Sequence, residues 1–289
     1  MKIHHFYDPD TSTLTYVVFD EVSLDAVIID PVLDFDPPSG KVDDTSAKKV
    51  LSYVKEQGLN VAFILETHAH ADHLSSSQLL KKHFPEAKVA ISSRIKMVQE
   101  TFKNILNLPH LAVDGSQFDF LFEDEIPFQA GAIKILPMAT PGHTPACSSF
   151  VIENNVFTGD ALFMPDYGTG RCDFPQGSAK NLFHSISRLY QLPDETNVFV
   201  GHDYPVNARE LRFQTSIGES KTSNIQLKAS TTESGYVAYR EGRDKTLKAP
   251  RLLFPSLQVN IAAGHLPKSE ENGKSYLKIP LTLTFKMDL

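Results

Sequence analysis

Hydrophobic and polar residues alternate along several short stretches of the chain, and elsewhere the hydrophobic residues recur every three or four positions. Alternation rich in β-branched and aromatic residues predicts strands, as do short apolar runs bounded by turn residues. These stretches are 14–20, 26–30, 61–65, 88–91, 118–122, 132–138 and 197–205, the last of which ends in a histidine loop. Helical spacing predicts helices over 44–57, 74–84, 93–105 and 178–191. In the last of these, Leu182, Ile186 and Leu189 fall on one face.

Turn residues organise the rest of the chain. Residues 31–45 contain three prolines and a glycine, which favours a loop. Residues 148–160 predict a hairpin that turns at Asn154 and Asn155. Beyond residue 206 the sequence becomes more polar, and residues 277–289 again have a strand-like pattern. We therefore expect an α/β sandwich over residues 1–206 and a C-terminal extension over 207–289 that packs on the same domain.

Composition narrows the class of protein. Of 289 residues, 41% are hydrophobic and 22% are charged, which is typical of a globular protein and excludes a disordered chain. The net charge of -7 argues against nucleic acid as a partner, because phosphate binding requires a basic surface. No apolar run is long enough to span a membrane, and the first residues do not resemble a secretory signal. Two cysteines, Cys147 and Cys172, make no disulfide framework, so a cytoplasmic location is expected.

The strongest chemical signal follows the apolar strand 61–65. His68, His70, Asp72 and His73 offer four nitrogen or oxygen donors within six residues. Imidazole and carboxylate ligands suit zinc, iron or manganese better than a metal that prefers thiolates. Without a cation, groups packed this closely would repel or desolvate one another. The motif therefore predicts a metal site.

Three other predicted strands also end in a histidine or an aspartate. His143 lies in the tight segment Thr140-Pro-Gly-His-Thr, Asp160 follows Thr158-Gly159, and His202 follows Val200-Gly201. Gly159 lets the backbone approach closely beside Asp160. Each of these signals is weak alone, but together they predict side chains that converge on the same metal site.

The order HxHxDH, TPGHT, TGD and GH resembles the metallo-β-lactamase superfamily over residues 10–206. The resemblance implies an αββα sandwich with the metal site at one edge of its two sheets. By the same resemblance, one metal position matches His68, His70 and His143, a second matches Asp72, His73 and His202, and Asp160 matches the bridging carboxylate.

Within the superfamily, two segments look like the persulfide dioxygenase branch. Residues 170–177, GRCDFPQG, resemble the GRxDFxxG signature of those enzymes, and residues 249–260 resemble a tail found in a bacterial subgroup. Glyoxalase II enzymes are similar up to the glycine-arginine pair and then diverge. The resemblance implies glutathione persulfide and O2 as substrates, with sulfite and glutathione as products. The alternatives are a zinc-dependent, glyoxalase II-like hydrolase of S-acylglutathione thioesters and a non-catalytic protein on the same fold.

The persulfide dioxygenase resemblance implies one Fe(II) per chain, held by His68, His143 and Asp160, with zinc as an alternative or substitute. Two histidines and a carboxylate leave three coordination positions open for substrate and O2. The other donors would then orient ligands and waters from behind, or form a second metal site. They are His70, Asp72, His73 and His202.

Two other residues are candidates for catalysis and substrate binding. Arg171 matches the family arginine near the glutathione site, and its guanidinium either holds a substrate carboxylate or pairs with Asp173 or Asp166. Tyr204 either donates its hydroxyl to substrate or oxygen, or packs. Cys172 is expected to be a small packed residue rather than a reactive thiol. The apolar run 252–259 in the extension is compatible with capping the pocket or with a homodimer interface.

Overall fold

The computed structural model describes residues 1–283 and contains two six-stranded mixed sheets. The first sheet has the strand order β1-β2-β3-β6-β8-β9. Its strands β1 to β3 form an antiparallel meander, and β3, β6, β8 and β9 are parallel neighbours. The strands are β1 (Lys2–Asp8), β2 (Thr13–Phe19), β3 (Asp25–Ile29), β6 (Asn60–Leu65), β8 (Lys88–Ser92) and β9 (Phe120–Phe122).

The second sheet follows chain order, β10-β11-β12-β13-β14-β15. All its pairs are antiparallel except β13 with β14. The strands are β10 (Phe128–Ala130), β11 (Ile133–Ala139), β12 (Ser148–Ile152), β13 (Asn155–Phe157), β14 (Asn197–Phe199) and β15 (Gln214–Ser216).

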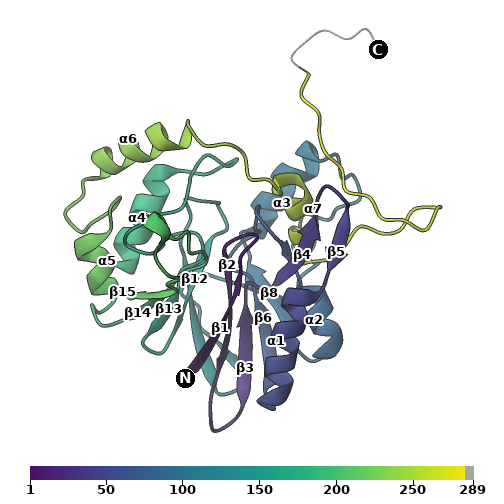
Figure 1. Cartoon of the computed structure of the whole chain (residues 1–289), viewed down its shortest axis with the longest axis horizontal. Helices are drawn as coiled ribbons and strands as arrows, with labels where there is room; N and C mark the ends of the chain where they lie inside the picture. The colour runs from purple at the N-terminus through teal and green to yellow at the C-terminus, as the bar shows by residue number, and fades with distance from the viewer. Residues whose placement is uncertain (284–289) are drawn as a thin grey trace.

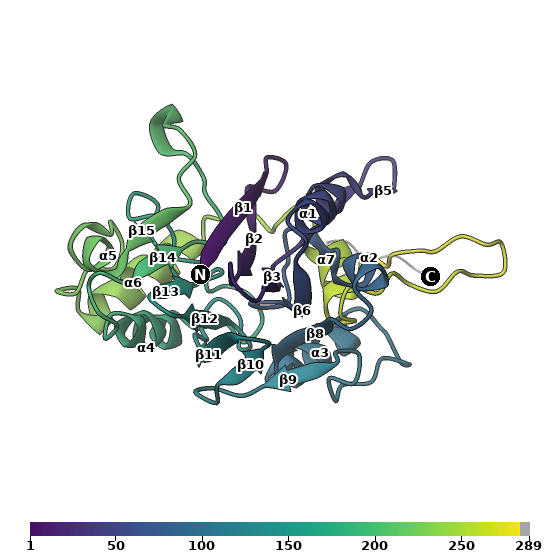
Figure 2. The same cartoon turned by 90° about the horizontal axis from the view of Figure 1, so that it is seen from below.

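Helices cover the outer side of each sheet (Figures 1 and 2). The first sheet is flanked by α1 (Thr45–Glu56), α2 (Ser77–His83), α3 (Ile95–Ile105) and α7 (Leu253–Asn260). The second is flanked by α4 (Ala179–Leu189), α5 (Ile217–Ser223) and α6 (Glu233–Asp244). A short 3-10 turn, η1 (Val206–Ala208), follows β14. The α/β class and the αββα sandwich predicted from the sequence are confirmed.

The side chains of β2 point alternately into two hydrophobic cores. Along β2, Leu14, Tyr16 and Val18 belong to the core between the sheets, whereas Val17 and Phe19 belong to the core beneath the helices of the first sheet. Successive strand residues point to opposite faces, so both faces of β2 are buried. In α4, Leu182, Ile186 and Leu189 are all fully buried, as their spacing predicts.

Three local predictions are wrong. Residues 31–45 are not a loop: β4 (Val32–Asp36) and β5 (Lys41–Asp43) form a small antiparallel sheet with β7 (Leu74–Ser75), and the prolines lie outside these strands. The predicted helix 74–84 begins as strand β7, and α2 starts only at Ser77. The 148–160 hairpin turns one residue early, because Ile152 pairs with Asn155.

The C-terminal segment contacts both halves of the sandwich. Strand β15 extends the second sheet, α6 packs near α4, and Leu257 and Ile261 join the core under the first sheet. Residues 277–283 form no strand, and the rest of the predicted strand-like tail lies outside the described residues. The division of the chain at residue 206 stays a prediction. Among residues 1–283, no helix combines the length and the apolar character needed to cross a membrane.

Candidate metal centre

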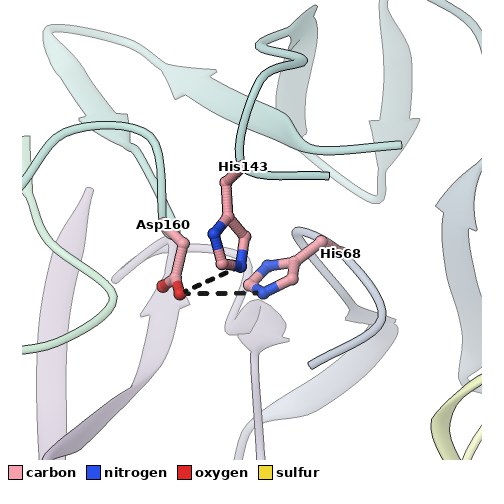
Figure 3. A group of neighbouring side chains, drawn as sticks. All are labelled: His68, His143 and Asp160. Carbon is pink, nitrogen blue, oxygen red and sulfur yellow. Dashed lines mark ion pairs between the residues drawn. The ribbon is translucent and has the colours of Figure 1, made fainter. Parts of the chain in front are cut away.

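The candidate ligands come from the ends of four strands. His68 follows β6, His143 follows β11, Asp160 follows β13 and His202 follows β14. Strands β13 and β14 run parallel, so their carboxyl ends lie at the same edge of the second sheet. The four loops meet there, as the sequence predicts, and Figure 3 shows His68, His143 and Asp160 facing one another.

Glycines allow these loops to approach closely. Gly159 has a φ of +48°, and a Cβ atom there would lie 2.6 Å from Oγ1 of Thr67. A Cβ atom on Gly170 would lie 1.9 Å from the carbonyl oxygen of Asp160. Only glycine fits at either position without moving the backbone beside Asp160.

The first group of donors comprises His68, His143 and Asp160. One ligand atom from each lies within 4.8 Å of the others, and all three side chains are buried. Oδ2 of Asp160 is 3.4 Å from Nε2 of His143 and 3.9 Å from Nε2 of His68. The arrangement offers two imidazole nitrogens and one carboxylate oxygen to a shared point.

A second group, His70, Asp72 and His73, satisfies the same 4.8 Å limit. His202 joins the two groups, because its Nε2 is 3.2 Å from Oδ1 of Asp160 and 3.3 Å from Oδ2 of Asp72. All seven donors predicted from the sequence therefore lie in one continuous cluster.

Backbone carbonyls fix the tautomers of three histidines. Nδ1 of His143 is 2.8 Å from the carbonyl oxygen of Arg171, Nδ1 of His202 is 3.1 Å from that of Ser12, and Nδ1 of His73 is 3.1 Å from that of Leu74. A carbonyl oxygen only accepts, so each Nδ1 carries the proton. The Nε2 lone pair of each ring is then free to bind a metal.

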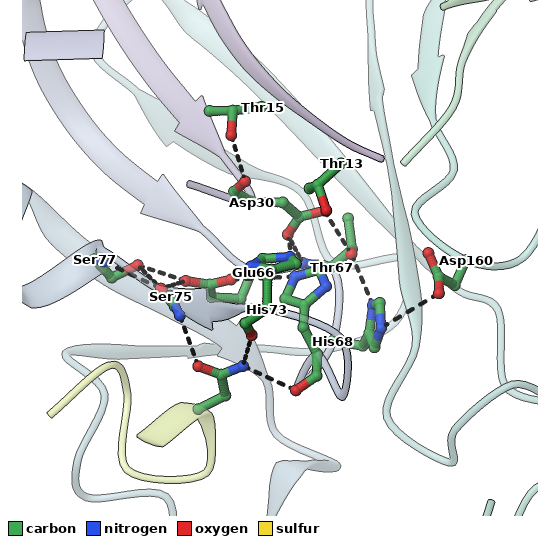
Figure 4. Close-up of polar contacts among 12 residues, drawn as sticks. Thr13, Thr15, Asp30, Glu66, Thr67, His68, His73, Ser75, Ser77 and Asp160 are labelled. Carbon is green, nitrogen blue, oxygen red and sulfur yellow. Dashed lines mark hydrogen bonds and ion pairs between the residues drawn. The ribbon is translucent and has the colours of Figure 1, made fainter. Parts of the chain in front are cut away.

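Asp30, which the sequence analysis missed, contacts His70 directly and reaches His68 through Thr67; Figure 4 shows Asp30, Thr67 and His68. Oδ1 of Asp30 is 3.0 Å from Nε2 of His70 and accepts from the amide of Thr67 at 2.7 Å. Its Oδ2 accepts from the hydroxyl of Thr67, whose Oγ1 is 3.0 Å from Nδ1 of His68. Asp30 follows strand β3 and so obeys the same rule of strands that end in an acid or a histidine.

Unpaired buried atoms test whether this cluster fits a metal. Within residues 1–283, four buried atoms of the cluster make no hydrogen bond: Nε2 of His68, Nδ1 of His70, Nε2 of His73 and Oδ1 of Asp160, whose contact with His202 is an ion pair only. Buried polar atoms are normally satisfied, and here a single kind of partner, a cation, would satisfy all four. Nitrogen and oxygen donors of this kind suit zinc, iron or manganese. The residues therefore fit a metal.

The titration behaviour of the cluster also favours a cation. Burial opposes ionisation of Asp160, yet the adjacent His202, His68 and His143 hold its pKa well below the ordinary value. Burial likewise disfavours charge on His202, but Asp160 and Asp72 raise the pKa of this imidazole to about 9. Burial and the neighbouring His70 lower the pKa of His68, which keeps that ring neutral. The carboxylates thus require positive charge, which a metal would supply in place of protons.

A cavity of about 270 Å³ opens onto this cluster. Its walls include Asp72, His143 and Asp160 from the cluster and the apolar side chains of Phe163 and Phe174. Three arginines also line it: Arg171, Arg240 and Arg243. Arg240 is buried and pairs with Asp244 at 2.5 Å. Among the described residues, Arg243 has no carboxylate within ion-pair distance, and no sequence motif marked this residue in advance.

The structure gives Arg171 an internal partner. Its Nε and Nη2 each donate to Asp173 at 2.6 Å, and its Nη1 donates to the carbonyl of Lys248 at 2.8 Å. The sequence left open whether Arg171 holds a substrate carboxylate or pairs with Asp173 or Asp166. In the structure Arg171 pairs with Asp173, and Asp166 pairs with Arg209 instead. A role for Arg171 in substrate binding stays a prediction.

Tyr204 also lines the cavity. Its ring stacks on His202 at a centroid distance of 5.5 Å and tilts against Tyr167 at 4.7 Å. Burial, together with the nearby Asp72 and Asp160, raises the pKa of Tyr204 well above its ordinary value, so the hydroxyl stays protonated. Both predicted roles, packing and hydrogen-bond donation, fit this position.

Comparisons with known proteins find relatives that bear the names of different enzymes. The chain is 48% identical to Glyoxylase B2 of Dictyostelium discoideum over 97% of both chains. It is 33% identical to persulfide dioxygenase ETHE1 of Homo sapiens, covering 80% of this chain and 78% of that protein. The crystal structure of ETHE1 from Myxococcus xanthus superposes with a TM-score of 0.74 at 32% identity, covering 92% of this chain and all of that one.

The two ETHE1 relatives support the predicted resemblance to the persulfide dioxygenase branch, while the relation to glyoxalase II is looser. Residues 9–202 match the model of the metallo-beta-lactamase superfamily. The match contains every one of the seven donors described above. The chain belongs to the metallo-beta-lactamase superfamily.

Proposed function

We propose that this protein is a persulfide dioxygenase that holds one Fe(II) through His68, His143 and Asp160. The observation that carries the proposal is the group of two imidazole nitrogens and one carboxylate oxygen beside a cavity. Two histidines and one carboxylate are the ligand set of non-haem Fe(II) oxygenases. The relatives named persulfide dioxygenase ETHE1, in sequence and in structure, support the same function.

The proposed reaction converts glutathione persulfide, O2 and water into glutathione and sulfurous acid, which ionises to sulfite. The outer sulfur of the persulfide is oxidised, O2 is the oxidant, and the sulfur–sulfur bond breaks. When bound, iron would supply redox chemistry and open coordination positions. Zinc could not replace it in the reaction, because zinc has no redox chemistry.

The chain's own residues would bind and orient the substrate. Phe163, Phe174 and Leu247 give the cavity apolar walls against which the persulfide would pack. The guanidinium of Arg243, which has no carboxylate partner among residues 1–283, is available to a substrate carboxylate, whereas Arg171 would have to leave Asp173 to take that role. The protonated hydroxyl of Tyr204 is a hydrogen-bond donor at the wall of the cavity.

The remaining donors would then support the iron site from behind. In this proposal, Asp30 and Thr67 fix the rings of His68 and His70, while His202 holds Asp160 and Asp72 in place. The proposal includes a cytoplasmic location. Both cysteines are free thiols, which is compatible with a reducing compartment.

A second candidate function rests on the second group of donors. His70, Asp72 and His73, with His202, could hold another metal beside the first. Two zinc ions would polarise a bound water for attack on a thioester carbonyl, as in a glyoxalase II-like hydrolase. The similarity to Glyoxylase B2 favours this alternative.

Oxygen uptake separates the two candidates. The protein is stripped of metal, loaded with Fe(II) without air, and given glutathione persulfide in an oxygen electrode cell. We expect oxygen consumption matched by sulfite formation, and no hydrolysis of an S-acylglutathione by the same sample. Thioester hydrolysis by the zinc-loaded protein, with no oxygen uptake by the iron-loaded protein, would overturn the proposal.

A further inference from the structure

Helix α7 ends in a buried asparagine that contacts the metal-binding loop. Asn260 lies at the end of the 249–260 segment and is 4% exposed. Its Nδ2 donates to the carbonyl oxygens of His70 and His73, both at 2.8 Å. Its Oδ1 accepts from the amide of Ser75, also at 2.8 Å. The side chain thus spans the loop from His70 to Ser75.

These contacts meet a specific need of the loop. Between β6 and β7 the chain has no regular structure, so the carbonyls of His70 and His73 have no partner in a strand ladder. Asn260 supplies the missing donors at the two histidines. It also fixes the backbone next to the Leu74 carbonyl, which is 3.1 Å from Nδ1 of His73 and sets the tautomer of that ring.

A second hydrogen-bond network, centred on Glu66, also contacts this loop. The hydroxyl of Ser77 donates to Oε1 of Glu66 at 2.5 Å, and the hydroxyl of Ser75 donates to the same oxygen. Oε2 of Glu66 is 3.4 Å from Nε2 of His70. Figure 4 shows Glu66, Ser75 and Ser77 together beside His73. Asn260 therefore anchors the backbone of a loop whose side chains are held by this buried network.

Helix α7 is a firm support for that contact. Leu257 and Ile261 pack in the core beneath the first sheet. The carbonyl of Ile261 accepts from Gln99 at 2.9 Å, and that of Ala263 accepts from Gln78 at 3.1 Å. Hydrogen bonds therefore hold the helix end to α3 and α2, so Asn260 presents its amide in a fixed orientation.

We propose that Asn260 is a positioning residue for the metal centre: it holds the loop from His70 to Ser75 in the conformation that presents the donors of His70, Asp72 and His73. Asn260 lies outside the stretch 9–202 that matches the superfamily, and it does not line the cavity. The inference rests on the metal site of the proposed function, not on the dioxygenase reaction.

The chain offers a matched control on the same helix. Gln258 is 6% exposed and also uses its amide fully. It donates to Lys278 and Phe254 and accepts from the amide of Lys278. Replacing Gln258 removes as many hydrogen bonds from α7 but none from the metal-binding loop.

The test compares Asn260→Ala and Asn260→Asp with Gln258→Ala. Metal affinity is measured by competition of zinc with a chelator, and ligand geometry by the visible spectrum of the cobalt-loaded protein. We expect both Asn260 variants to lose metal affinity by about tenfold or more and to change the cobalt spectrum. Gln258→Ala should match the wild type in both readouts.

Activity gives a further readout if the enzyme is a dioxygenase. Because Asn260 does not reach the cavity, its variants should lower kcat at saturating metal and leave the KM for the persulfide unchanged. Wild-type affinity and an unchanged cobalt spectrum in both Asn260 variants would overturn the proposal, and so would an equal metal loss in Gln258→Ala. If neither variant folds, Asn260→Ser, which keeps one donor, replaces them under the same criteria. A failure of the dioxygenase assay alone leaves the zinc and cobalt results standing.

Discussion

Replacing Asp30 by asparagine removes one charge and one acceptor from a buried position and keeps the shape of the side chain. Asp30 accepts from the amide and hydroxyl of Thr67, both at 2.7 Å, and from Nε2 of His70 at 3.0 Å. Asparagine has one oxygen and one NH2 group for these three donors. With NH2 in place of Oδ2, one donor, the Thr67 hydroxyl, meets another donor; with NH2 in place of Oδ1, two donors do, the Thr67 amide and Nε2 of His70.

Both orientations harm a metal ligand. If the new NH2 group faces the Thr67 hydroxyl, that hydroxyl accepts from it and turns its own hydrogen toward Nδ1 of His68, 3.0 Å away. The His68 proton then moves to Nε2, the atom that should bind the metal. If NH2 faces His70 instead, the proton of that ring must move to Nδ1. We therefore expect Asp30→Asn to weaken metal binding by about 10–100-fold, or about 1.4–2.7 kcal/mol.

The assay is competition between the protein and a chelator for zinc, which needs no redox chemistry. Asp25→Asn is the matched control, because Asp25 begins the same strand and accepts from the amide of Ala132 at 2.8 Å, away from the histidines. That variant should bind zinc like the wild type. A folded Asp30→Asn protein with wild-type zinc affinity would refute the tautomers that the contacts of Asp30 and Thr67 assign to His68 and His70.

Four other parts of the molecule can be tested by simpler experiments. Asp160→Ala should lose bound iron while remaining folded, because only two histidines of the first group remain; metal analysis showing a full equivalent would contradict the ligand assignment. Gly170→Ala should destabilise the protein by about 1–3 kcal/mol, because the new Cβ meets the Asp160 carbonyl. Gly242→Ala, which adds a Cβ in open space on α6, should stabilise it by about 0.5–1 kcal/mol. Denaturant unfolding measures the free energy of unfolding of both variants. Arg243→Ala should raise the KM for an anionic glutathione substrate with little change in kcat, and an unchanged KM would remove Arg243 from substrate binding. Neither cysteine should react with iodoacetamide at neutral pH until the protein is unfolded, because burial raises the pKa of Cys147 to about 12 and raises that of Cys172 as well; rapid alkylation of the native protein would disprove this.

The metal centre was predictable from the sequence because one rule covers it. Donors at the ends of β6 in the first sheet and of β11, β13 and β14 in the second gather in one place, and the pattern shows both the strands and the donors. Asp30 obeys the same rule, but a single aspartate followed by proline gave no separate signal. Asn260 obeys no such rule. Its contact with His70 joins residues 190 positions apart, and only the packing of α7 creates it.

The small sheet of β4, β5 and β7 shows another limit. Prolines in a sequence favour a loop, but here Pro37 and Pro38 lie in the turn between β4 and β5 and leave both strands intact. Strand β7 is two residues long, too short for any periodic pattern. Likewise, the sequence left two roles open for Arg171, because its pairing with Asp173 depends on the rotamers of both side chains.

The central claim of the proposed function is that one Fe(II) per chain is enough for dioxygenase activity. Metal-free protein is titrated with Fe(II) without air, and the rate of oxygen uptake with glutathione persulfide is measured at each addition. The rate should rise linearly and stop rising at one equivalent of iron per chain, with sulfite formed in step. A break at two equivalents, or iron-loaded protein that consumes no oxygen, would rule out the mononuclear iron enzyme.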